Sequence, residues 1–317
     1  MQGNQAPSKT NTKAAKPVEN TLLNQLDALD KYVSRPFFLA RLPAVVEYAL
    51  SIPGNCFGVP LFALFVAPNL TAMYFSETPP LSTWWHLIVW SLVLAVLVLW
   101  VFVLKGNRLA IKTFYGPMLG AIAPVFGIAL LSLMPDILAR QVGFFQLTAW
   151  CVSVIPVALL KPSAARGRPA CQEDCGTVKA AMNAKHLAIL PRLFQHDSQA
   201  SFPSGDAAGA MAVMYSVGRC GGGNSLAIAL ICVTLSATGR MYWQAHHLGD
   251  VVVGVGLALL CCWLLEQLVQ TDGCRAEWWQ ALSAHVVLCT IVILSRLFHK
   301  TKVFSGGTIR TEENKKL

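Results

Sequence analysis

The sequence has few charged residues for its length. Of its 317 residues, 13% are charged and 55% are hydrophobic, and the mean hydropathy is +0.52. Soluble domains carry about 25% charged residues, so this composition argues against a soluble globular protein. The class that remains is a membrane protein. In such a protein a helix of about 20 apolar residues crosses the hydrocarbon because it satisfies its own backbone hydrogen bonds.

The apolar runs predict several membrane spans, near residues 48–68, 85–104, 117–134, 144–160, 204–219, 225–239, 248–266 and 280–298. The first run is interrupted by Pro53, Gly54, Gly58 and Pro60, residue types that break or weaken a helix. We therefore expect an all-α fold, a polytopic helical bundle of about eight spans within residues 44–298.

The two ends of the chain lack apolar runs. Residues 1–19 are polar and rich in Lys, which predicts a disordered tail and no cleavable signal peptide, and residues 299–317 form a second polar tail. Residues 20–43 place several leucines at helical spacing. This pattern predicts an amphipathic helix on the membrane surface, although packing against the bundle would give the same pattern.

Acidic residues are scarcer than basic ones, 16 against 25, which gives a formal net charge of +9. The basic residues lie in loops and tails, so they do not form the single basic face that a nucleic-acid partner requires. Both tails and the loops 105–116 and 161–203 share one side of the expected bundle, whereas the opposite loops carry almost no Lys or Arg. We expect that basic side to be cytoplasmic, in the endoplasmic reticulum or another endomembrane or in the plasma membrane.

The ten cysteines do not suggest a disulfide framework. Seven lie in or beside apolar runs, where a buried thiol acts as a small hydrophobic residue: Cys56, Cys151, Cys220, Cys232, Cys261, Cys262 and Cys289. Cys171 and Cys175, with His186 or His196, leave a zinc site as an alternative. The main expectation is that the protein uses no metal and no cofactor.

Three short stretches concentrate the polar residues that could carry chemistry. The first, KPSAARGRP, brings Lys161, Arg166 and Arg168 to the end of a predicted span. A positive flank that anchors the helix at the lipid headgroups would explain this charge equally well. The second, FPSGDAAGA, places Ser204 and Gly205 at the start of a helix, where backbone N–H groups and the helix dipole favour a phosphate. A plain N-cap followed by a small-residue packing face is the alternative.

The third stretch, GRMYWQAHHLGD, contains Arg240, His246 and Asp250 before a predicted span. His246 and Asp250 are four residues apart, so on one helix they would share a face, and the carboxylate would fix the tautomer of the imidazole. A histidine with an orienting acid and a nearby arginine is typical of an activated nucleophile that faces an anion.

Together the three stretches resemble the type 2 phosphatidic acid phosphatase superfamily, whose pattern is K-x6-R-P, then P-S-G-H, then S-R-x5-H-x3-D. The resemblance covers about residues 144–266. It implies a six-helix core and a membrane enzyme that hydrolyses a lipid phosphate or diphosphate without a metal. It also implies that His246 attacks phosphorus to form a phosphohistidine, with Asp250 orienting the ring. The remaining roles would go to phosphate-holding residues: Lys161, Arg168, Arg240, Ser204 and Gly205.

Two positions depart from the family pattern. Gly239 replaces a serine that makes a minor contact, and Asp206 replaces the histidine that protonates the leaving oxygen. An ordinary Asp has a pKa of about 3.9 and is a poor acid at neutral pH. Burial could raise the pKa of Asp206, or the proton could come from another histidine: His186, His196 or His247.

A third possibility is that no acid is needed, because a diphosphate leaves as a phosphate whose second pKa is about 6. A polyprenyl or other isoprenoid diphosphate is then the favoured substrate.

Three rival functions are a lipid phosphotransferase, a catalytically impaired lipid-phosphate-binding relative, and a transporter or channel. The polar residues cluster at span ends on one side, which suits surface chemistry better than passage through the membrane.

Overall fold

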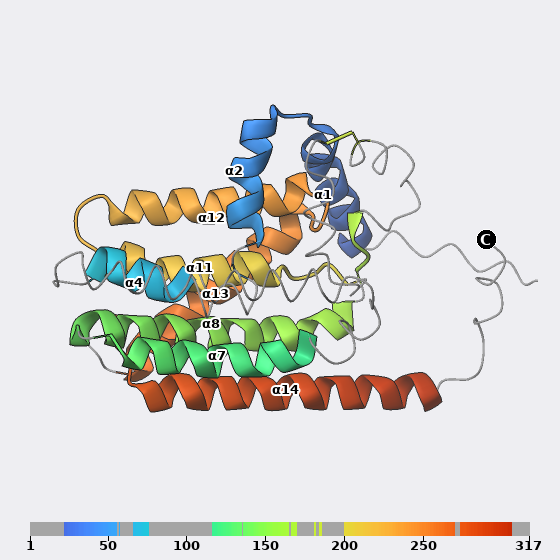
Figure 1. The fold of residues 1–317 in the computed structure, drawn as a ribbon. Helices are drawn as coiled ribbons and strands as arrows, with labels where there is room; N and C mark the ends of the chain where they lie inside the picture. Colours follow the sequence, from blue (N-terminus) through green and yellow to red (C-terminus); the bar gives the residue numbers. More distant parts are fainter. Residues whose placement is uncertain are drawn as a thin grey trace, which may run out of the picture.

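The computed structural model of the chain describes residues 22–55, 57, 66–75, 116–134, 136–164, 166–169, 181, 184–185, 200–269 and 273–305. These residues form an all-α structure (Figure 1). Its helices are α1 (Leu22–Leu39), α2 (Ala44–Asn55), α4 (Ala67–Phe75), α7 (Gly116–Ser132), α8 (Ile137–Ala164), α11 (Gly205–Cys220), α12 (Ser225–Tyr242), α13 (Leu248–Val269) and α14 (Trp278–Ser305).

Within the described residues, four helices are long and apolar enough to cross a membrane: α8, α12, α13 and α14. Helix α7 is apolar but shorter, and α11 has 16 residues. A multi-pass membrane protein follows from these helices. The predicted span 85–104 lies outside the described residues.

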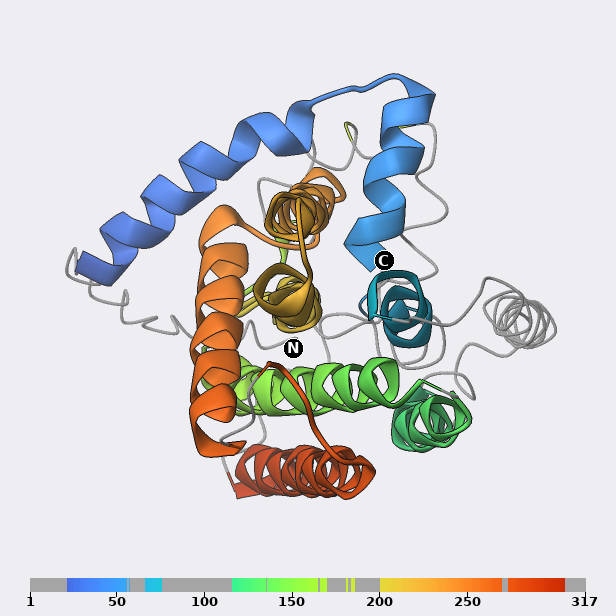
Figure 2. The ribbon, with the colours of Figure 1, turned by 90° about the vertical axis from the view of Figure 1, so that its left-hand side faces the viewer.

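Helix α11 is the centre of the bundle, packed against α8, α12 and α13. Figure 2 shows α11 and α12 end-on, with α8 and α13 beside them. Small residues allow this packing, because a Cβ added to Gly209 would lie 2.7 Å from Nε1 of Trp150 on α8. The core around α11 continues through buried residues of α8 such as Phe145 and Leu147, so the site residues at the helix ends rest on a packed interior.

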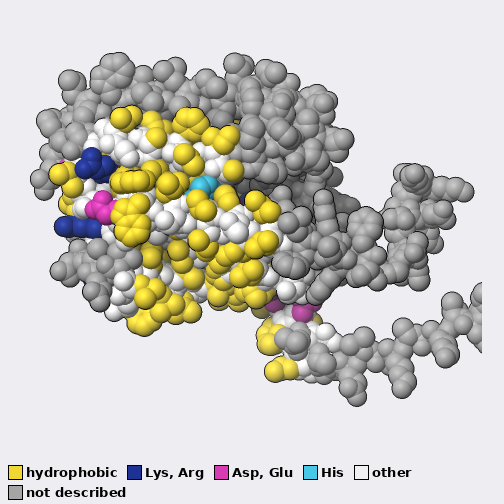
Figure 3. Space-filling model, turned by 90° about the horizontal axis from the view of Figure 1, so that it is seen from below, with side chains coloured by type: hydrophobic (Ala, Val, Ile, Leu, Met, Phe, Trp, Pro, Cys, Tyr) yellow, Lys and Arg dark blue, Asp and Glu magenta, His cyan; other side chains and the backbone are white. Residues whose placement is uncertain are grey.

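The outer face of α14 is the clearest lipid-facing surface. Over residues 278–295, where burial is described, its exposed large side chains are hydrophobic: Trp278, Trp279, Val286, Val287, Ile293 and Leu294. Figure 3 shows hydrophobic side chains over most of the coloured part of this face, with Lys, Arg and acidic groups at the left edge and further acidic groups at the lower right. In water such a patch would be unfavourable, whereas in a bilayer it faces hydrocarbon of the same polarity.

The predicted span 48–68 is not one continuous helix. Helix α2 ends at Asn55, Phe57 lies in a turn, and α4 begins at Ala67. Pro53 and Gly54 fall in the last turn of α2, where these residue types favour helix termination. Figure 1 shows α2 running across α12 and not along it, so this segment covers the end of the bundle.

Helix α1 also runs across one end of the bundle and contacts α12 and α13 (Figures 1 and 2). Ser34 and Phe38, on the face of α1 that packs against the bundle, are buried. Its outer face exposes large apolar residues: Leu22, Leu26, Leu29, Tyr32 and Val33. The helix is therefore amphipathic, as its leucine spacing predicts, with an apolar face that no described residue covers.

A disulfide joins Cys220 at the end of α11 to Cys274, which precedes α14. The prediction that Cys220 is a buried thiol is therefore wrong. Cys220 closes an apolar run, but its partner is 54 residues away, and nothing in a single sequence indicates that pairing. The prediction does hold for Cys151 and Cys262, which are free and buried.

Candidate active site

The first cationic stretch begins where α8 ends. Lys161 lies in the last turn of α8, and residues 166–169 leave the helix in an extended path. An isolated antiparallel bridge pairs Gly167 with Ala200, and the Ser201 N–H donates to the carbonyl oxygen of Arg166 at 2.7 Å. These backbone bonds join the two segments, which fixes the cationic residues beside the start of α11.

Ser204 is the N-cap of α11, as the sequence predicts, because its Oγ accepts a hydrogen bond from the Ala207 N–H at 3.4 Å. The Ser204 N–H donates to the carbonyl oxygen of Asp250 at 2.9 Å, which ties α11 to α13. Gly205 then supplies the first N–H group of the helix, a position that has no intrahelical acceptor.

Arg240 lies in the last turn of α12 and is buried. Its Nη1 donates to the carbonyl oxygen of Gly54 on α2 at 3.3 Å, and its Nη2 forms an ion pair with Oδ2 of Asp206 at 3.0 Å. Asp206, which replaces the expected histidine, thus forms an ion pair with Arg240, one of the cations predicted to hold the phosphate. The ion pair stabilises the carboxylate form of Asp206.

His246 and Asp250 do not share a helix, contrary to the simplest interpretation of their spacing. Helix α13 begins at Leu248, so His246 lies in the connection before it while Asp250 lies in the first turn. The two still face each other, with Nδ1 of His246 3.7 Å from Oδ2 of Asp250. Both side chains are buried, and the ring presents Nε2 on the side away from the carboxylate.

The adjacent His247 also faces Asp250, with its Nδ1 3.5 Å from the same Oδ2. Its backbone N–H donates to that oxygen at 2.9 Å, and its ring packs edge-to-face on Phe38 of α1. One carboxylate oxygen therefore meets two imidazoles. The other histidines named as proton sources, His186 and His196, lie outside the described residues, as do Cys171 and Cys175.

Cations of the first and third stretches converge on His246. Burial lowers the pKa of this imidazole from 6.5 to about 3, Asp250 raises it, and the positive charges of Arg240, Arg168 and Lys161 lower it again. The ring is therefore neutral at physiological pH. A neutral imidazole surrounded by cations is suited to attack an anionic phosphorus centre, because its lone pair is free and the cations attract the substrate.

Sequence reasoning named Arg166 as a cation but missed its function in the fold, and it missed Asp27 and Asp30 of α1. All three residues contact the site through ion pairs. Asp27 and Asp30 occupy polar positions of the amphipathic helix, and this is the sequence feature that could have marked them. Their partner, Arg166, lies more than 130 residues away in sequence, so the pairing itself could not be predicted.

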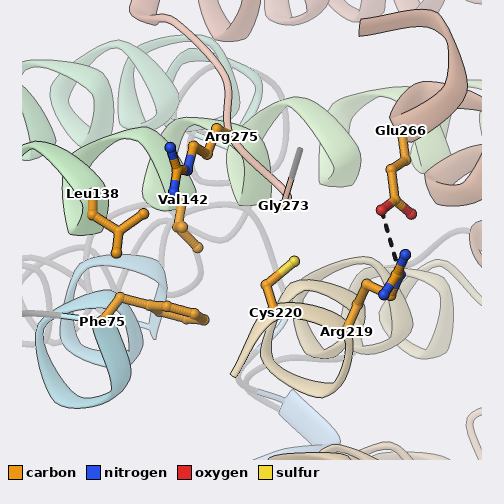
Figure 4. A pocket seen from close by; sticks show the side chains of 8 residues that line it. All are labelled: Phe75, Leu138, Val142, Arg219, Cys220, Glu266, Gly273 and Arg275. Carbon is orange, nitrogen blue, oxygen red and sulfur yellow. Dashed lines mark ion pairs between the residues drawn. The ribbon is translucent and has the colours of Figure 1, made fainter. Parts of the chain in front are cut away.

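A separate pocket lies at the opposite end of the bundle, beside the disulfide (Figure 4). Its charged lining includes Arg219 and Glu266, which form an ion pair with Nε and Oε1 3.4 Å apart. No residue of the three motif stretches lines it. The candidate active site is therefore the buried cluster around His246 at the other end of the helices.

Residues 143–274 match the PAP2 superfamily, the type 2 phosphatidic acid phosphatases. This part of the chain is a PAP2 superfamily domain, and it contains every residue of the three motif stretches. Comparisons with curated proteins and with solved structures give no match. The PAP2 superfamily implies a phosphate-ester substrate, and the four candidate spans make this a membrane protein.

Proposed function

We propose that the protein is an integral membrane lipid phosphatase that hydrolyses a lipid phosphate or diphosphate through a phosphohistidine. The observation that carries this proposal is the convergence of Arg240, Arg168 and Lys161 on a buried neutral His246, whose Nδ1 faces Asp250. These groups come from the first and third motif stretches, which meet at one end of the bundle.

In the proposed reaction, Nε2 of His246 attacks phosphorus while the bond to the leaving oxygen breaks, and the electron pair of that bond departs with the leaving group. Asp250 stabilises the positive charge that develops on the imidazole. The cations and the N–H of Gly205 stabilise the phosphoryl oxygens in the transition state. Water then attacks the phosphohistidine, which releases inorganic phosphate and restores the neutral ring.

The ion pair between Asp206 and Arg240 supports a diphosphate substrate. A lipid alcohol leaves poorly as an alkoxide and needs a proton, which an ionised Asp206 does not carry. A diphosphate leaves as a phosphate monoester, which is already a stable anion near neutral pH. An isoprenoid diphosphate such as a polyprenyl diphosphate is therefore the substrate class we propose.

The experiment is a phosphate-release panel on purified protein in mixed micelles without added divalent metal. Farnesyl and longer polyprenyl diphosphates are compared with phosphatidic acid, and His246→Ala is the control. We expect faster release from the diphosphates and release at background in the control. A preference for phosphatidic acid would contradict the substrate class, and full activity of His246→Ala would contradict the mechanism.

Asp206 also favours a second candidate, a relative that binds lipid phosphate without turnover. The same panel separates the two, because a binding protein would be stabilised by phosphate against thermal unfolding yet release none. A phosphotransferase would release phosphate slowly until an acceptor lipid is added.

For the membrane arrangement, we propose that residues 44–298 form the transmembrane domain, with about eight spans. The segment 20–43 would lie at the interface, with the outward apolar face of α1 in the headgroup region. The residue ranges 1–19 and 299–317 would be polar tails. The basic loops support a cytoplasmic position for the candidate active site.

A further inference from the structure

Arg166 lies at the centre of a cluster of three carboxylates. Its Nη1 is 2.6 Å from Oδ1 of Asp250 and 2.7 Å from Oδ2 of Asp30, and its Nη2 is 2.7 Å from Oδ1 of Asp27. The Arg166 side chain is 16% exposed and that of Asp250 is fully buried. A guanidinium with several donors in a fixed plane is suited to bridge carboxylates in this way.

Helix α1 supplies two of these carboxylates and also holds the start of α13. Oδ1 of Asp30 accepts a hydrogen bond from the Gly249 N–H at 2.8 Å, and Oγ of Ser34 accepts one from the Leu248 N–H at 2.8 Å. The approach requires glycine, because a Cβ on Gly249 would lie 2.6 Å from Oδ2 of Asp30. Helix α1 therefore caps the helix that carries Asp250.

The charges around Arg166 distinguish it from the cations that face His246. Burial lowers the pKa of Arg166, but the carboxylates of Asp250 and Asp30 raise it above its ordinary value. Three carboxylates of the protein thus balance its charge, whereas Arg240, which pairs with Asp206 alone among the ion pairs described above, lowers the pKa of the imidazole together with Arg168 and Lys161. A phosphate-holding role does not fit a guanidinium that three carboxylates surround.

We infer that Arg166, held by Asp27 and Asp30 of α1, is a positioning residue that fixes the Asp250 carboxylate against His246. By binding Oδ1, it directs Oδ2 toward the two histidines, which lie 3.7 and 3.5 Å from that oxygen. Helix α1 lies outside the matched residues 143–274, so this inference assigns the positioning of Asp250 partly to a helix beyond the matched domain. The inference rests on the proposed function for its kinetic consequence.

The first test is kinetic and uses Arg166→Gln, Arg166→Lys and Asp30→Asn. Arg166→Gln should lower kcat for phosphate release by about 10- to 100-fold with little change in KM, as expected when an orienting partner is lost. Arg166→Lys, which keeps the charge, should recover part of that loss. A rise in KM with unchanged kcat would assign Arg166 to substrate binding and overturn the inference.

Asp30→Asn keeps an acceptor for the Gly249 N–H but removes the charge that holds Arg166, so kcat should fall in the same direction. A wild-type kcat in this variant would overturn the part assigned to α1. Arg35→Gln is the matched control, because Arg35 is an exposed arginine of the same helix, and it should behave as wild type.

The second test follows the His246 ring directly and does not need turnover. The charged and titratable groups around His246 come from several elements. They are Asp250 on α13, Arg240 on α12, Lys161 in the last turn of α8, Arg168 after α8, and the adjacent His247. Without Arg166, the charge of Asp250 is no longer balanced, so it should favour the protonated imidazole. The pKa of His246 should then rise by roughly one unit or more in Arg166→Gln.

The measurement is NMR of protein labelled at histidine Cε1 in micelles, with the signal assigned by its loss in His246→Gln. Arg166→Lys and Arg35→Gln should titrate as wild type. An unchanged titration in Arg166→Gln would overturn the inference whatever the kinetics show. If wild-type protein releases no phosphate, the proposed function fails, while this titration still tests the positioning role.

Discussion

Asp206 is the residue on which the choice of substrate depends. Its carboxylate pairs with Arg240 at 3.0 Å, where a proton donor is expected for a lipid alcohol as leaving group. If Asp206 donates a proton, Asp206→Asn should lose most activity and Asp206→His should retain or raise it, measured as phosphate release from phosphatidic acid. Equal rates in the two variants would exclude that role. With a polyprenyl diphosphate we expect Asp206→Asn to remain active.

His246 should make stability depend on pH. Its folded pKa of about 3 lies below its ordinary value of 6.5, so the unfolded chain takes up a proton first as the pH falls. The stability that the neutral ring contributes is therefore fully present above pH 6.5 and is lost progressively toward pH 3. Thermal unfolding in detergent between these values should show a falling midpoint, and His246→Gln should flatten that slope.

The spacing of the three motif stretches predicts which residues meet, but not every partner of each. Lys161, Arg168 and Arg240 converge on His246 as the pattern indicates, because the pattern reflects one binding geometry. The ion pair between Asp206 and Arg240 was not predicted, because it joins the start of α11 to the end of α12, and sequence spacing does not encode that contact. Arg166 was visible as a charge at a span end, but its three acids come from distant segments.

At the scale of helices, the close packing of α2 on α12 explains why Gly239 stands where the family pattern has a serine. A Cβ there would lie 2.5 Å from the carbonyl oxygen of Leu50, and the same contact brings Gly54 of α2 within reach of Arg240. The backbone of α2 thus occupies the space that a serine side chain would need.

We therefore expect Gly239→Ser, which restores the family residue, to destabilise the protein by about 1–3 kcal/mol and to lower activity. Gly256→Ala in α13 is the matched control, because nothing lies within 4 Å of its added Cβ, and it should be neutral or stabilising. Thermal unfolding midpoints of both variants provide the measurement. A Gly239→Ser protein as stable as wild type would mean that α2 moves away at little cost.

Apolar runs locate most of the described helices within a few residues, since burial in the bilayer or the core selects continuous hydrophobic sequence. The runs near 225–239 and 248–266 correspond to α12 and α13. The second run begins at residue 248, where α13 begins, but hydrophobicity does not reveal that His246 faces Asp250 across that boundary. The direction of α2 across the bundle depends on tertiary contacts that hydrophobicity does not encode.

For the whole molecule, the two ends of the bundle differ in chemistry. The cationic cluster lies at one end, and the disulfide between Cys220 and Cys274 lies at the other. Disulfides persist in oxidising compartments, so the disulfide end should face the lumen or the exterior and the candidate active site the cytosol. This agrees with the distribution of basic loops.

Counting reactive thiols tests the disulfide. Denatured protein treated with a maleimide polymer should take up two more labels after reduction than before, and a Cys220→Ser/Cys274→Ser variant should show no such difference. We expect that variant to be less stable by about 2–4 kcal/mol, because the unfolded chain loses the constraint. Equal labelling of the wild type with and without reduction would contradict the pairing and the orientation drawn from it.

The connection between α11 and α12 has a practical consequence. Among the described residues, no atom lies within 4 Å of a Cβ added to Gly222 or Gly223, and both glycines lie at the end of the bundle opposite His246. An epitope inserted between them should leave the fold and the proposed phosphate release intact, so antibody access in selectively permeabilised cells would report the sidedness of the native protein.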